Sequence, residues 1–134
     1  MSIEPEPHLD EASLEKAAMA YHILVITSTL EGDFDIPKGK QITHYILRQF
    51  PGFHKMMPEE SRKILSMPSE DLAPYFYTSI KRFSDIASEQ EKLDLINTIF
   101  RVLTITNPEL SEEHQQVYSA IAEVFGIDIK TMLE

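Results

Sequence analysis

The stretch LEGDFDIPK, residues 30–38, joins a long apolar segment to the start of the next amphipathic one. It places three carboxylates close together, at Glu31, Asp33 and Asp35, and a proline follows where a helix can begin, because the first helical turn does not need the N–H that proline lacks. A second acidic stretch, TNPELSEE at residues 106–113, lies at the same kind of junction near the C-terminus. Both stretches are therefore predicted to be loops between helices.

Around these loops, apolar residues recur every three to four positions, which is the period of an amphipathic helix. The β-branched run Val25, Ile26 and Thr27 favours a strand only locally, and the helical period around it extends much further. No alternating apolar run and no Asn-Gly or Asp-Gly turn indicates a hairpin. We therefore expect an all-α, single compact domain of about seven helices. Their expected positions are residues 10–32, 37–50, 58–67, 69–87, 89–105, 111–126 and 128–133.

Several helix ends carry local signals. Ser88 with Glu91 three residues later fits a capping box, and Ser69 and Ser111 are predicted N-caps. Gly126 is predicted to follow the end of a helix as a C′ residue. The segment 89–105 is the most apolar of the chain, so we expect it to be the central helix.

Composition excludes some classes of function. The formal net charge is −10 at pH 7, which disfavours nucleic acid or an anionic membrane surface as a partner. The chain has no cysteine, so disulfides, thiolate metal sites and cysteine nucleophiles are excluded. Residues 1–9 are acidic and proline-spaced, which predicts a flexible arm before a domain at residues 10–134. The longest uncharged run is too short to span a bilayer, and we expect a cytoplasmic protein that is not integral to a membrane.

The acidic loops admit two interpretations. One is a site for a hard divalent cation of the Ca²⁺ or Mg²⁺ type, because such ions are bound by clustered carboxylate oxygens. The alternative is that the acids only solvate the loops and complement helix dipoles, as in a plain helical scaffold or dimerisation protein. The cation hypothesis requires the two loops to converge in space, and its candidate ligands are Glu31, Asp33, Asp35, Glu109, Glu112 and Glu113.

The two loops together resemble the TerB-like domain, the family of tellurite-resistance protein B. The family pattern has an apolar helix ending in Ala-Asp-Gly, an Ile-Asp pair and a Glu that opens the next helix. A similar Ala-Asp-Gly and Glu-Glu element precedes a last helix ending in Leu-Gly-Ile. In this chain the first element reads Leu30-Glu31-Gly32, Phe34-Asp35 and Lys38. The second reads Thr106-Asn107-Pro108, Leu110 and Glu112-Glu113, with Phe125-Gly126-Ile127 at the end.

The resemblance covers residues 14–127 and implies an all-helical fold of about seven helices with a cation-binding acidic surface. It also implies a stress-response role, such as resistance to tellurite, within membrane-associated or multi-protein complexes. The family's acidic positions carry over to Glu31, Asp35 and Glu113. At other positions the chain departs from the pattern, with Asn107 in place of Asp, Pro108 in place of Gly, and Lys38 in place of Glu.

Other chemistry receives little support. No His-x-x-x-His pair, nucleophile elbow or phosphate loop is present, so we expect no catalytic residues and no cofactor other than the divalent cation. A metal-dependent hydrolase using the loop carboxylates is a third, weaker class. His22 is expected to be a partly buried, hydrogen-bonded side chain and His114 an exposed one.

The segments 53–57 and 75–77 are rich in methionine and aromatic residues, which suit either an adaptable interaction surface or the core between short helices. We favour the core. The function expected from the sequence is a non-enzymatic, TerB-like interaction or stress-response module with a protein partner, or a homodimer.

Overall fold

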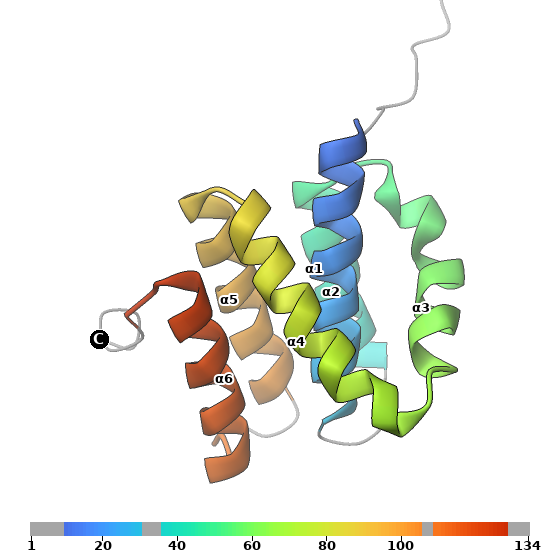
Figure 1. Cartoon of the computed structure of the whole chain (residues 1–134). Helices are drawn as coiled ribbons and strands as arrows, with labels where there is room; N and C mark the ends of the chain where they lie inside the picture. The colour runs from blue at the N-terminus through green and yellow to red at the C-terminus, as the bar shows by residue number, and fades with distance from the viewer. Residues whose placement is uncertain (1–9, 31–35, 106–108, 129–134) are drawn as a thin grey trace, which may run out of the picture.

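The computed structural model describes residues 10–30, 36–105 and 109–128, and within them the chain is all-helical (Figure 1). Six α-helices are present in these ranges rather than about seven, together with one short 3₁₀ helix, η1. The predicted arm and all of the seventh predicted helix except its first residue, Asp128, fall on residues outside the described ranges. The helices are α1 (Glu11–Thr29), α2 (Ile36–Gln49), η1 (Phe53–Met56), α3 (Met57–Leu65), α4 (Ser69–Ile86), α5 (Glu89–Thr104) and α6 (Glu112–Phe125).

The central helix is α1, not the predicted segment 89–105. Every residue from 20 to 28 is buried, and α1 packs against α2, α3, α4 and α5. Small side chains such as Ala17, Ala20 and Ser28 let neighbouring helices approach it from several sides. In contrast, the first six residues of α5 are exposed or partly exposed, and its buried residues begin only at Leu95.

The polar residues at the end of α1 are buried without loss of hydrogen bonding. The hydroxyls of Thr27 and Ser28 donate to the carbonyl oxygens of Ile23 and Val25, each at 2.6 Å. Such bonds back to the preceding turn satisfy a buried hydroxyl within its own helix. The β-branched run is therefore helical, as the period predicted, although α1 ends at Thr29 rather than at Gly32.

Most of the predicted helix-capping residues are confirmed. Ser88 and Glu91 form the predicted capping box, and the side chain of Ser111 accepts a hydrogen bond from the N–H of His114 at 3.1 Å. Gly126 follows α6 with a φ of 73°, a left-handed conformation that glycine adopts without a Cβ penalty. The prediction for Ser69 was wrong, because it is the first residue of α4 and Pro68 occupies the N-cap position.

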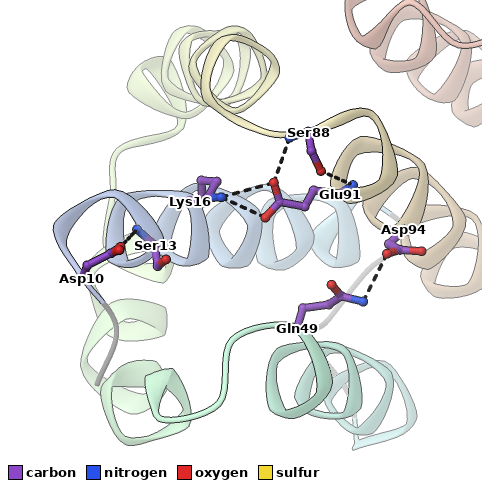
Figure 2. A network of polar contacts seen from close by, with 7 residues as sticks. All are labelled: Asp10, Ser13, Lys16, Gln49, Ser88, Glu91 and Asp94. Atoms are coloured by element: carbon purple, nitrogen blue, oxygen red, sulfur yellow. Dashed lines mark hydrogen bonds and ion pairs between the residues drawn. The ribbon is translucent and has the colours of Figure 1, made fainter. Parts of the chain in front are cut away.

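Polar contacts fix α5 against α1 and α2 (Figure 2). The Lys16 ammonium lies 2.9 Å from Oε2 of Glu91, and the other carboxylate oxygen, Oε1, accepts from the N–H of Ser88 at 2.8 Å. Burial by itself would raise the pKa of Glu91, but the bonds from Ser88 and Lys16 outweigh it and hold the pKa below its usual value. On α2, the Gln49 amide donates to Asp94 at 3.3 Å.

Candidate functional site

The predicted cation ligands divide into two sets. Glu31, Asp33 and Asp35 lie outside the described residues, so the hypothesis for the first loop stays a prediction. Glu109, Glu112 and Glu113 are described, and all three are exposed. Within the described ranges, no three His, Asp or Glu side chains are grouped closely enough to hold a metal ion. The described helix ends that flank both loops do lie at the same end of the bundle (Figure 1).

Lys38, which replaces the glutamate of the TerB-like pattern, has a structural role. Its side chain is only 2% exposed, and its ammonium donates to the carbonyl oxygen of Ser28 at 3.0 Å. This carbonyl belongs to the last turn of α1, where a positive charge complements the helix dipole. The junction between α1 and α2 therefore already contains a positive charge, the Lys38 ammonium, which lies three residues after Asp35 in the sequence.

A polar cluster that the sequence did not predict joins α1, α3 and α4. Its centre is His22, whose Nε2 lies 2.7 Å from a carboxylate oxygen of Glu60 and whose Nδ1 lies 2.6 Å from the Tyr75 hydroxyl. A neutral imidazole fits both contacts, with Nε2–H donating to Glu60 and Nδ1 accepting from Tyr75. Lys63 donates to the second oxygen of Glu60 at 3.2 Å.

Burial and hydrogen bonding act in opposite directions on both ionisable partners at the centre of this cluster. Burial lowers the pKa of His22 below its usual value, although the neighbouring Glu60 acts in the opposite direction. For Glu60, burial would raise the pKa, but the hydrogen bonds from His22 and Lys63 outweigh it and lower the pKa. Both pKa shifts favour a neutral His22 imidazole beside an ionised Glu60 carboxylate. The expectation of a partly buried, hydrogen-bonded His22 is confirmed.

His114 is not the exposed residue that the sequence predicted. It is 9% exposed and shares the buried face of α6 with Tyr118, Ile121 and Phe125. The spacing of these four positions follows the helical period, so the signal was present in the sequence. The prediction was wrong because His114 lies in the first turn of α6 beside two acidic residues, a position typical of exposed side chains.

A wide hollow of about 740 Å³ opens between α2 and α3, with Tyr21 of α1 at its base. Tyr21 is buried, and its ring meets that of Phe53 edge-on at 5.9 Å between centroids. The α2 wall begins at Ile36, immediately after the undescribed residues 31–35. The lining is Tyr21, Ile36, Gly39, Lys40, Thr43, His44, Met57, Pro58 and Ser61.

A smaller groove of about 230 Å³ lies between α4 and α6, and its surface is almost wholly apolar. Each helix contributes four residues at the same i, i+3, i+4, i+7 spacing. The residues are Ala73, Phe76, Tyr77 and Ile80 of α4, and Val117, Ala120, Ile121 and Val124 of α6. We call this feature the α4/α6 groove.

The three aromatic residues of segment 75–77 differ in their contacts and in their exposure. Tyr75 turns to His22, Phe76 is half-buried in the α4/α6 groove, and Tyr77 is 54% exposed at the same groove. The expectation that this segment fills the core is therefore wrong for Tyr77. In the segment 53–57 the core interpretation holds for the buried Phe53, whereas Met56 is 41% exposed.

A scan against protein-family models found no match, and neither did searches of the curated proteins and of the solved structures. Among the described helices, none is both long and apolar enough to cross a membrane.

Proposed function

We propose that this chain is a TerB-like interaction module that acts by binding rather than by catalysis, and that its α4/α6 groove holds a helical segment of a partner protein. The observation that carries the proposal is the groove itself, an apolar channel open to solvent. Apolar surface gathered in one such channel is unfavourable in water and is typical of interaction sites. The polar clusters of the described residues, in contrast, join helix to helix.

The spacing of the lining residues favours a helix as the occupant. Two parallel i, i+3, i+4, i+7 stripes form the walls of a groove into which a third helix can place its own apolar stripe. The exposed Tyr77 supplies the large, rigid aromatic side chain that often anchors such contacts. Ala73 and Ala120 are small and exposed, so they leave room for the partner's side chains.

Three synthetic peptides of about 14 residues, or four helical turns, test the proposal. All carry leucine at the same helical spacing, and they differ only in having lysine, glutamine or glutamate at the remaining positions. We expect at least one of them to shift the amide NMR signals of Ala73, Tyr77 and Ala120. Two outcomes contradict the proposal: no peptide binds, or binding moves signals elsewhere and leaves these three unchanged.

A matched pair of variants controls for location. Ala73→Gln with Ala120→Gln places polar side chains in the groove, and we expect peptide affinity to fall by about tenfold or more, since leucine then loses an apolar contact. Ser119→Gln makes the same kind of change on an exposed position of α6 outside the lining. Equal affinity for all three proteins contradicts binding in the groove.

A further inference from the structure

The α4/α6 groove has two unlike ends. Near the C-terminal ends of the helices it is closed, since the Ser84 hydroxyl donates to the carbonyl oxygen of Val124 at 3.0 Å and the rings of Phe83 and Phe125 are 5.7 Å apart. Towards their N-terminal ends α4 and α6 separate (Figure 1). The two walls therefore diverge towards the end that Ala73 and Val117 line, which we call the wide end, and the first turns of α4 and α6 lie beyond it.

The wide end is acidic. Glu70 and Asp71 lie in the first turn of α4, and Glu112 and Glu113 lie in the first turn of α6. All four are exposed, and neither first turn carries a lysine or an arginine. A helix N-terminus contributes only about half a positive charge, so the two carboxylates on each helix exceed the dipole.

The closed end is mixed in charge. Lys81 and Arg82 lie in the C-terminal half of α4, together with Asp85, and Glu123 lies in that of α6. The ammonium of Lys81 sits 4.7 Å from the centre of the Tyr77 ring, and Arg82 pairs with Glu15 of α1. Of the four acids at the wide end, Glu70 stands three residues before Ala73 and Glu113 stands four before Val117, so these two continue the groove-lining faces. Charge therefore changes along the groove, from two acids aligned with the wide end to a near balance at the closed end.

We infer that the occupant of this groove is an amphipathic helix of a partner protein whose basic side chains lie at the wide end. This inference rests on the proposed function and adds the charge of the partner. The leucine-type stripe would occupy the apolar walls, while lysine or arginine side chains flanking it would reach the carboxylates of Glu70 and Glu113. Complementary charge of this kind selects among apolar helices and speeds their encounter with the groove.

The same three peptides distinguish the proposed function, binding of an apolar helix in the groove, from the further inference that this helix is basic. We expect the leucine–lysine peptide to bind about tenfold more tightly than the leucine–glutamine peptide, and the leucine–glutamate peptide to bind most weakly. The advantage of lysine should shrink between about 50 and 500 mM NaCl, because salt screens exposed charges. Equal affinity of the lysine and glutamine peptides, with both binding in the groove, overturns the charge inference and leaves the proposed function standing.

Charge-neutralising variants locate the effect. Glu70→Gln with Glu113→Gln should remove most of the lysine advantage, because these two carboxylates continue the groove-lining faces of α4 and α6. Glu11→Gln with Glu59→Gln, the same change in the first turns of α1 and α3, should leave it intact. If both pairs reduce affinity for the lysine peptide equally, attraction to the net charge of the whole chain explains the preference, and the inference fails.

Two rival occupants have distinct signatures. If residues 129–134 of the same chain filled the groove, their deletion would tighten peptide binding by about tenfold or more. If a second copy filled it, the chain would be dimeric by light scattering, and Ala73→Gln with Ala120→Gln would make it monomeric. We expect neither result, and either one overturns the assignment of a basic partner helix.

Discussion

The Tyr75 hydroxyl lies 2.6 Å from Nδ1 of His22, a contact that joins α4 to the central helix α1 across 53 residues of sequence. The opposite ring nitrogen is bound to Glu60 of α3. One buried imidazole thus holds three helices in register, and in its neutral form it does so as the tautomer that donates through Nε2 and accepts through Nδ1. Specificity of helix arrangement, rather than chemistry on a substrate, is the role that this geometry supports.

Tyr75→Phe should destabilise the fold by about 1–3 kcal/mol, because it leaves Nδ1 of a buried histidine without its donor. Chemical denaturation followed by circular dichroism measures the loss. Tyr77→Phe is the matched control, since Tyr77 is exposed and its change should stay within about 0.5 kcal/mol. Equal losses for the two variants would show that the hydrogen bond to His22 contributes nothing.

The free energy of unfolding should depend on pH through His22. Burial lowers the pKa of His22 in the folded state below the value of 6.5 of an unperturbed histidine, so the unfolded chain binds this proton more readily. Stability is then full above about pH 6.5 and decreases as the pH falls towards the folded-state pKa, by on the order of 1 kcal/mol.

Denaturation at pH 7.5 and 5.5 measures this decrease, and His22→Gln should reduce it. The lowered pKa of Glu60 acts in a separate, more acidic window, since its reference value is 4.5. An unchanged pH dependence in His22→Gln would falsify the assignment.

Much of the fold follows from short-range sequence signals. Ser88, Ser111 and Gly126 act on their own helix ends, so their roles are independent of the rest of the chain. The identity of the central helix is a different matter. Periodicity shows which face of a helix is apolar, but the burial of α1 on several sides depends on where four other helices pack.

The α4/α6 groove escaped prediction for a related reason. Phe76 and Ile80, like Val117 and Ile121, fit the core face of an amphipathic helix, and from sequence they are indistinguishable from fully covered residues. Only the angle between two helices that begin 43 residues apart leaves the stripes uncovered at one end. The His22–Glu60–Tyr75 cluster likewise requires three helices to meet. Its residues are far apart in the sequence, so no local spacing pattern indicates it.

The Lys16–Glu91 ion pair should contribute modestly to stability. Both side chains are partly shielded, at 20% and 24% exposed, and the carboxylate is already held by its capping box. A double-mutant cycle with Lys16→Met and Glu91→Gln should give a coupling free energy of about 0.5–1 kcal/mol, with glutamine retaining the cap.

The matched comparison for this pair is Lys92 with Glu89, which pairs at 3.3 Å on the same helix with Glu89 85% exposed. Its coupling should be about 0.2–0.5 kcal/mol. A larger coupling for this pair, whose carboxylate is exposed, than for Lys16–Glu91 would contradict the view that shielding of both partners strengthens the bond between α1 and α5.

The acidic loop at residues 31–35 gives the sharpest test of the TerB-like resemblance. If Glu31, Asp33 and Asp35 bind a divalent cation, Ca²⁺ or Mg²⁺ at about a hundred times its dissociation constant should stabilise the fold by about 2.7 kcal/mol and raise Tm by several degrees. Asp33→Ala with Asp35→Ala should abolish the rise, and Glu59→Ala with Glu70→Ala should not.

Lys38 makes this test more specific, because its buried ammonium already supplies positive charge at the same junction. Lys38→Met should cost about 1–3 kcal/mol by removing the donor to the Ser28 carbonyl. If the lysine competes with a cation for the loop carboxylates, the variant should regain part of this loss when Ca²⁺ or Mg²⁺ is added, whereas the parent chain responds less. No thermal shift in either protein with either ion would sink the cation site and leave the acids as solvating and dipole-complementing groups.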